Sequence, residues 1–195
     1  TALMTWHTNP AVIGLRNTAR RLGLTRHLAG LRGAKSYEHA FDDALFSALR
    51  EGDMVWDVGA NVGYYTKRFA ETVGPDGHVV AFEPFPMTAE RLRAHMQDTP
   101  NHSLQMLALG AEDGEVSMQA GGDDLGATSR IVAGAGHGVA IRIVTGDGLV
   151  GRNEVPAPTV LKIDTEGFEL DVLRGTAGLL GSPGVRAVFV EVHFG

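Results

Sequence analysis

The sequence of 195 residues contains no cysteine, which excludes disulfide bonds and cysteine-ligated metal sites. It has no apolar run near the roughly 20 residues that span a bilayer. Its first residues also lack the charged region, apolar region and cleavage site of a secretory signal, so we expect a cytoplasmic protein. The formal net charge is −6, and no five consecutive residues are dominated by Lys and Arg. A nucleic-acid partner is therefore not expected.

The composition is that of one globular α/β domain, because 44% of the residues are hydrophobic and 21% are charged. Apolar residues in 9–50 follow helical spacing and predict an N-terminal helical cap of the same domain, spanning 1–52. Gly52 and Asp53 follow the last apolar position, as the residues that end a helix commonly do. Residues 53–195 are expected to form the main part of the domain.

From residue 53 on, short apolar runs alternate with segments of helical spacing. The expected strands are 54–58, 78–84, 103–110, 159–164 and 185–195, and the expected helices are 63–73, 86–98 and 168–180. Parallel strands need long crossovers, which helices supply, so the order predicts an α/β fold with a mostly parallel sheet flanked by helices.

The middle of the chain changes character. Alternating runs at 115–119 and 139–144 predict an antiparallel excursion, and a glycine-rich loop at 120–138 joins them. A loop of that length is commonly either a disordered tip or a functional lid. As a lid, it would order over the binding crevice when substrate is bound.

The first expected strand runs into a glycine-containing turn, VWDVGANVG, over residues 55–63. In an open parallel sheet the binding crevice lies at the carboxyl ends of the strands, where this turn falls. A dinucleotide fingerprint needs G-x-G-x-x-G, but Gly59 is followed by Asn61 and then Gly63. The glycines let a ligand lie against the backbone, and nothing in the turn is shaped for phosphates.

Glu83 lies at the end of the second expected strand, twenty residues after Gly63. A carboxylate at this place can accept bonds from both hydroxyls of a ribose and weighs against a 2′-phosphate. Asp57, the G-x-N-x-G turn and Glu83 together suit S-adenosylmethionine, with negative charge near its sulfonium cation. The alternative is that Glu83 merely ends the strand.

The stretches YEHAFDDALFSALREGDMVWDVGANVGYYT, VAFEP, ALG, VLKIDTEGFELDVLRG and VFVEVH closely resemble the FkbM-type family of S-adenosylmethionine-dependent methyltransferases. The similarity runs from Tyr37 to His193. It implies a Rossmann-like class I methyltransferase fold for 53–195 and methylation of hydroxyl oxygens on small molecules such as polyketides, sugars and glycolipids. It implies cofactor contacts at Asp57, Gly59, Asn61, Gly63 and Glu83, with Leu107, Ala108 and Leu109 beside the adenine. Such folds finish with two further strands, so an incomplete C-terminal end of the sheet is expected.

Methyl transfer to a hydroxyl needs a base that takes the proton, and the candidates lie near the ends of the last two strands. Asp164 could be this base or could cap the next helix. Glu166 could be this base or could stabilise that helix through the helix dipole. His193 titrates near neutral pH but is a lone histidine, and Glu191 shares its strand face. Lys162, on the face of Asp164, is expected to neutralise a neighbouring acid.

Two other readings remain open. A divalent cation could be bound by Asp164, Glu191 and His193, but the resemblance gives no support for one, so no metal is expected. The whole chain could instead be a nucleotide-dependent oxidoreductase, against which the missing third glycine argues, or a cofactor-binding protein without catalysis.

Overall fold

The computed structural model of the chain describes residues 32–119, 130–131, 138–165 and 167–192. The chain divides into two compact units, one up to Ser47 and one from Ala48 on. Helix α3 (Arg32–Ala48) is the described part that precedes the sheets. It ends four residues before Gly52, the predicted terminator. Gly52, with φ of 80°, belongs to the following turn, where its N–H donates to the Val73 carbonyl at 2.9 Å.

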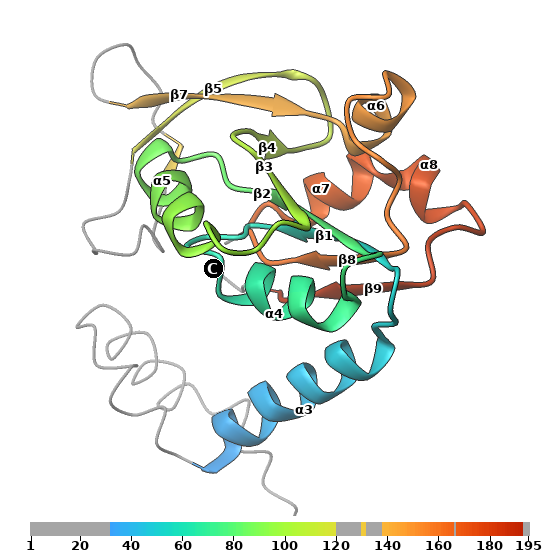
Figure 1. The fold of residues 1–195 in the computed structure, drawn as a ribbon. Helices are drawn as coiled ribbons and strands as arrows, with labels where there is room; N and C mark the ends of the chain where they lie inside the picture. The colour runs from blue at the N-terminus through green and yellow to red at the C-terminus, as the bar shows by residue number, and fades with distance from the viewer. Residues whose placement is uncertain (1–31, 120–129, 132–137, 166, 193–195) are drawn as a thin grey trace, which may run out of the picture. The chain divides into compact units, whose positions relative to one another are not determined.

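A five-stranded parallel sheet forms the centre of the second unit (Figure 1). Its strands in spatial order are β3 (His102–Gln105), β2 (His78–Phe82), β1 (Met54–Val58), β8 (Val160–Ile163) and β9 (Ala187–Val190). All four neighbouring pairs are parallel. The predicted Rossmann-like α/β class is therefore correct, and the carboxyl ends of all five strands lie at one edge of the sheet.

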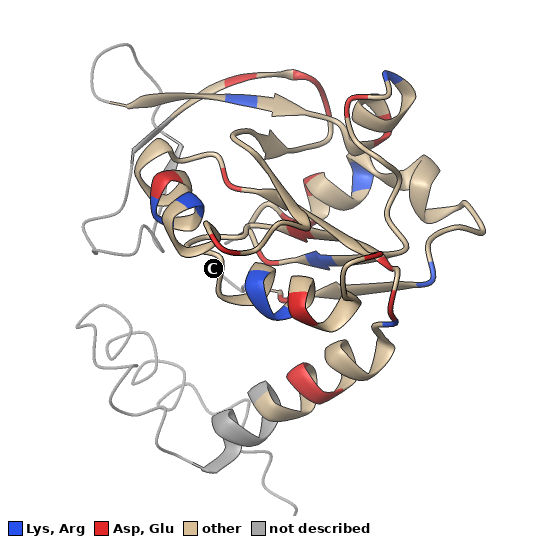
Figure 2. Ribbon diagram, in the orientation of Figure 1, with Lys and Arg blue, Asp and Glu red and all other residues tan. Residues whose placement is uncertain are grey.

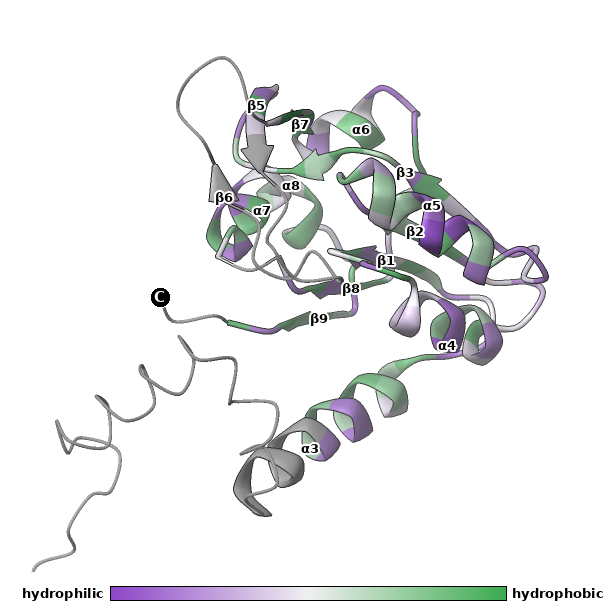
Figure 3. Cartoon of the chain, turned by 90° about the vertical axis from the view of Figure 1, so that its left-hand side faces the viewer, coloured by the Kyte–Doolittle hydropathy of each residue, from purple (hydrophilic) through white to green (hydrophobic). Residues whose placement is uncertain are grey.

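Helices cover both faces of this sheet (Figure 1). On one face lies α4 (Tyr64–Val73), which follows β1, and α5 (Pro86–His95) connects β2 to β3. On the other lies α7 (Glu169–Gly175), which α8 (Ala177–Leu180) and α6 (Gly146–Gly151) accompany. Figure 3 shows hydrophobic residues along the strands and hydrophilic ones on the outer turns of α4 and α5.

Alternation along the strands decides which residues face which helices. The main apolar cluster takes Trp56, Val58, Val80, Phe82, Leu161 and Ile163 from the central strands, with Leu149, Val172 and Leu179 from α6, α7 and α8. The intervening residues face α4, and among them are a fully buried aspartate and a buried lysine, Asp57 and Lys162. The α4 face of the sheet is thus the one that carries charge.

A second sheet carries the predicted antiparallel excursion. It contains β4 (Ala108–Leu109), β7 (Val139–Val144), β5 (Gly114–Gln119) and β6 (Arg130–Ile131) in that order. β5 pairs antiparallel with both β7 and β6, while β4 pairs parallel with β7. The single strand predicted for 103–110 is wrong, because β3 and β4 belong to different sheets. The predicted loop at 120–138 falls mostly outside the described residues.

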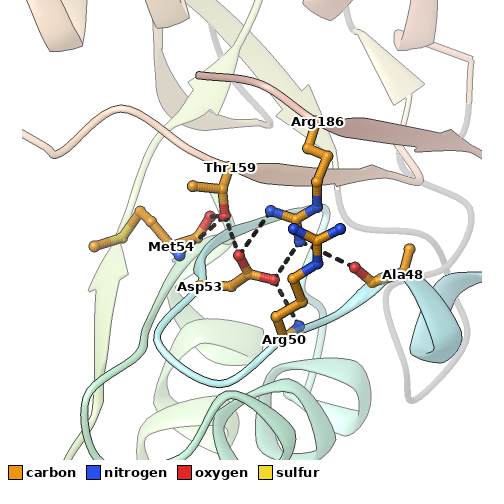
Figure 4. Close-up of polar contacts among 6 residues, drawn as sticks. All are labelled: Ala48, Arg50, Asp53, Met54, Thr159 and Arg186. Atoms are coloured by element: carbon orange, nitrogen blue, oxygen red, sulfur yellow. Dashed lines mark hydrogen bonds and ion pairs between the residues drawn. The ribbon is translucent and has the colours of Figure 1, made fainter. Parts of the chain in front are cut away.

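At the amino ends of the central strands, a polar network surrounds Asp53 (Figure 4). Its carboxylate accepts bonds from the Arg186 guanidinium at 2.6 and 3.0 Å, from the Thr159 hydroxyl at 2.9 Å and from the Arg50 N–H at 2.7 Å. Arg186 also donates to the Ala48 carbonyl at 3.0 Å. Burial raises the pKa of Asp53, but the bonds from Arg186, Thr159 and Arg50 outweigh it and lower the pKa below 3.8. This network joins the starts of β1, β8 and β9.

Charged residues of both signs are interspersed over the described helices and strands (Figure 2). Within the described ranges, no helix is both long and apolar enough to cross a membrane.

Candidate functional site

The turn that follows β1 is held between the ends of two neighbouring strands. The N–H groups of Gly59 and Ala60 both donate to the Phe82 carbonyl of β2, at 3.1 and 3.0 Å. Gly59 has φ of 79°, and a Cβ added to it would lie 1.9 Å from the Asp164 carbonyl oxygen after β8. Asn61 and Gly63 also have positive φ, 51° and 84°. Only glycine fits at position 59, because backbone approaches backbone there.

Glu83 clamps this turn from the end of β2. Its Oε2 accepts a bond from the Asn61 N–H at 3.0 Å, and its Oε1 accepts one from the Phe85 N–H at 3.0 Å. The side chain is buried, and burial raises the pKa of Glu83 more than these two bonds lower it. Glu83 thus holds the turn as well as ending the strand, and its contact with a ribose stays a prediction. Each carboxylate oxygen retains capacity for a second donor.

Lys162 joins the ends of β1 and β8 through two carboxylates. Its Nζ lies 3.3 Å from Asp57 Oδ1 and 3.2 Å from Asp164 Oδ2, and 3.5 Å from the Gly59 carbonyl. Burial lowers the pKa of Lys162, but the charges of Asp57 and Asp164 more than offset this, so its pKa is raised. The expectation that Lys162 neutralises an acid is confirmed for two acids.

Helix α4 supplies the remaining partners of this charged group. The Thr66 hydroxyl donates to Asp57 Oδ2 at 2.7 Å, and the Tyr65 ring centroid lies 4.9 Å from Lys162 Nζ. The sequence prediction missed both residues. They lie two and three residues after Gly63, in the first turn of α4, so their nearness to the predicted turn was the available signal.

Three buried side-chain oxygens have no hydrogen-bond partner among the described residues: Asp57 Oδ1, Asn61 Oδ1 and Thr165 Oγ1. Asp57 Oδ1 has only the ion pair with Lys162, at 3.3 Å. All three belong to β1, to its turn or to the residues after β8, and buried polar atoms are seldom left unpartnered. These oxygens gather at the carboxyl edge where the sequence predicts the cofactor, and the acidic residues there suit its sulfonium cation, so the residues present fit that group.

The three residues predicted to lie beside the adenine are Leu107, Ala108 and Leu109. The side chains of Leu107 and Leu109 belong to the main core cluster, whereas Ala108 packs against the pair Phe85 and Ile141. The contact of this segment with adenine therefore stays a prediction.

The candidate base Asp164 lies four residues before Phe168, the N-cap residue of α7, whose own side chain makes no capping bond. Glu191 directly follows β9, and its N–H donates to the Ile163 carbonyl at 2.9 Å, which places it at the same sheet edge. Glu166 and His193 lie outside the described residues.

The described residues contain no group of three His, Cys, Asp or Glu side chains placed to hold a metal ion. The hypothetical site of Asp164, Glu191 and His193 includes one residue beyond this range.

Comparison with known proteins gives a consistent result. The family model described as the methyltransferase FkbM domain matches residues 57–195. The hexuronic acid methyltransferase AglP of Haloferax volcanii is 35% identical over 158 residues, which are 77% of this chain and 60% of that protein. A protein-L-isoaspartate O-methyltransferase of Ignicoccus hospitalis is 47% identical over 59 residues, which are 30% of this chain and 28% of its own. The chain thus spans less than two thirds of either relative.

Solved structures of methyltransferases are similar at low sequence identity. A precorrin-6y C5,15-methyltransferase of Geobacter metallireducens has a TM-score of 0.48 and 14% identity, covering 83% of this chain and 64% of that one. Aeropyrum pernix fibrillarin with bound S-adenosyl-L-methionine has a TM-score of 0.38 and 16% identity, covering 59% of this chain and 34% of that one.

Proposed function

Because this chain belongs to the FkbM methyltransferase family, whose cofactor is S-adenosylmethionine, we propose that it catalyses O-methylation of a hydroxyl group on a small, sugar-like molecule. The observation that carries the proposal is the charged group at the carboxyl edge of the sheet, where Asp57 and Asp164 flank the single ammonium of Lys162. The cofactor supplies an electrophilic methyl group on a sulfonium cation.

The charge at this edge supports a cationic cofactor. Asp57 and Asp164 carry two negative charges against one positive charge on Lys162, and Glu83 adds a third carboxyl. Surroundings of net negative charge stabilise a sulfonium and repel the pyrophosphate of a dinucleotide. This argues against the alternative of a nucleotide-dependent oxidoreductase, as does the spacing of the glycines.

The exposure of the carboxylates supports Asp164 as the base. Asp57 is fully buried, whereas the side chain of Asp164 is 25% exposed. An acceptor hydroxyl can therefore reach Asp164 but not Asp57, and a base must come within hydrogen-bond distance of the proton it takes. Glu191, Glu166 and His193 remain alternative candidates for this role.

The relative AglP and the charge at the sheet edge support the proposed acceptor class. AglP is named for a hexuronic acid, which offers both hydroxyl and carboxyl oxygens. A carboxylate acceptor would need no base, but it would approach an edge where carboxylates outnumber the ammonium. A neutral hydroxyl meets no such repulsion, and an adjacent carboxylate can take its proton.

The first experiment tests the cofactor site by calorimetric titration with S-adenosylhomocysteine. Replacing Glu83 with Ala removes a charged acceptor and should weaken binding by about 1.5–3 kcal/mol, roughly ten- to a hundredfold. Glu71→Ala is the matched control, because Glu71 is exposed on α4 and should bind as the wild type does. Equal affinity of all three proteins would remove Glu83 from the site.

The second experiment tests the reaction with radiolabelled cofactor and a panel of uronic acids and neutral sugars. We expect label in a product that resists mild alkali, as a methyl ether does. Label that alkali releases would indicate a methyl ester and contradict the hydroxyl assignment. Binding of S-adenosylhomocysteine without transfer to any sugar would instead favour a cofactor-binding protein without catalysis, and binding of a nicotinamide cofactor alone would favour an oxidoreductase.

A further inference from the structure

Lys162 occupies an unusual place for a lysine, because its side chain is 2% exposed in the middle of a parallel sheet. Strand register makes Asp57 its direct neighbour on β1, and Asp164 lies two residues further along β8 on the same face. A lysine at this position therefore reaches both carboxylates without leaving its strand.

The α4 side closes the space around the ammonium. The Tyr65 ring covers Lys162 Nζ at 4.9 Å and itself stacks on Phe69, with 5.7 Å between ring centroids. The Tyr65 ring, the two carboxylates and the Gly59 carbonyl therefore surround the ammonium. Because the ammonium is enclosed by protein, it contacts Asp164 from one fixed side.

We propose that Lys162 is a positioning residue, which orients the Asp164 carboxylate at the end of β8 for proton transfer. The inference rests on the proposed function, in which Asp164 is the base. Lys162 touches neither acceptor nor cofactor in this role. Its effect passes through one oxygen of Asp164, the Oδ2 that lies 3.2 Å from Nζ.

Other charged residues lie near this group, and the test variants leave them unchanged. Glu83 lies close enough to Lys162 and Asp57 for its pKa to respond to both charges. Glu191 follows β9 at the same edge, and the Arg68 guanidinium lies 5.9 Å from the centroid of the Tyr65 ring. The Lys162 ammonium itself lies near both Asp57 and Asp164.

Removing the ammonium alone would leave Asp57 fully buried without a counter-charge, which threatens folding. The test therefore compares Asp57→Asn with the double variant Asp57→Asn and Lys162→Met. Asparagine can still accept the bond from Thr66, and methionine matches the length of the lysine stem. Lys67→Met is the matched control, since Lys67 lies on α4 and is only half-buried.

The first readout is the split between turnover and cofactor affinity. Relative to Asp57→Asn, kcat of the double variant at neutral pH should fall about ten- to a hundredfold, because the carboxylate is no longer held in place. The Kd for S-adenosylhomocysteine should stay within about threefold. Lys67→Met should keep the wild-type kcat and Kd. An unchanged kcat in a folded double variant would overturn the inference.

The second readout needs no turnover. Carbon-detected NMR relaxation of the Asp164 carboxyl reports its mobility in Asp57→Asn and in the double variant, and we expect a more mobile carboxylate without the lysine. Equal mobility overturns the inference even if methylation is observed. A more mobile carboxylate in a protein that methylates nothing supports the role of Lys162 in holding the carboxylate while the proposed function fails.

Discussion

Replacing Gly59 with Ala tests whether the close approach of β1 and β8 builds the cofactor edge. Gly52 provides a matched control, because it has φ of 80° against 79° for Gly59, yet a Cβ at position 52 meets nothing within 4 Å. Gly52→Ala should therefore cost only the left-handed conformation, about 1–2 kcal/mol of unfolding free energy. A Cβ at position 59 would lie 1.9 Å from the Asp164 carbonyl oxygen, so the turn or the end of β8 must move by about 1 Å.

That movement disturbs two hydrogen bonds, Gly59 N–H to the Phe82 carbonyl at 3.1 Å and Asp164 N–H to the Val58 carbonyl at 3.0 Å. Each contributes about 0.5–1.5 kcal/mol, so Gly59→Ala should lose about 2–5 kcal/mol in total. Urea denaturation measures both variants, and calorimetry should show weaker binding of S-adenosylhomocysteine for Gly59→Ala alone. If both variants lose the same stability and bind equally, the close approach has no role in the site.

Three further predictions concern stability, measured by urea unfolding. Arg186→Ala removes the guanidinium from the buried Asp53 carboxylate and should cost about 1–3 kcal/mol of unfolding free energy. Because the folded-state pKa of Asp53 lies below 3.8, the stabilisation by its carboxylate is full above that pH and is lost as pH falls through the folded pKa. Asp53→Asn should abolish this loss of stability at low pH. Burial, aided by the nearby His102, lowers the pKa of His78 below 6.5, so stability should fall as pH drops from 6.5 toward that lower value, and His78→Gln should flatten this fall. Trp56→Ala empties a fully buried position and should cost about 3–5 kcal/mol, whereas a loss below about 1 kcal/mol would contradict its place in the core.

The central strands were predictable because their apolar runs are short and bounded by turn residues. The predicted bounds 54–58 and 139–144 agree with β1 and β7. The run 103–110 was misread, because periodicity cannot show that Met106, which is 43% exposed, separates strands of two different sheets.

The predicted helix 168–180 is interrupted at Thr176, which separates α7 from α8. The side chain of Asp147 accepts bonds from the N–H groups of Gly178 and Leu179, at 2.8 and 2.9 Å, and so caps α8 from a distant segment. Helix α6, which contains Asp147, was not predicted at all, because a segment with three glycines has low helix propensity. Contacts between distant segments decide both cases, and local propensity does not include them.

At the site, the sequence indicated the residues but not their contacts. Spacing placed Lys162 and Asp164 on one strand face, and the structure adds that Asp57 shares the same ammonium. The roles of Tyr65 and Thr66 depend on how α4 packs on the sheet, which the strand pattern does not specify.

The pairing of β1 with β8 has a consequence for how the protein is made. Hydrogen bonds between Met54 and Thr159 join residues 105 positions apart, yet β1 lies at the centre of the sheet. During synthesis at about 5–20 residues per second, β1 waits about 5–20 s for its second neighbour to emerge from the ribosome. Until then the nascent sheet has an open hydrophobic edge, and Asp57 has no lysine to balance it. A chaperone that binds newly made chains should therefore engage this protein during that interval and release it once residue 163 has left the exit tunnel.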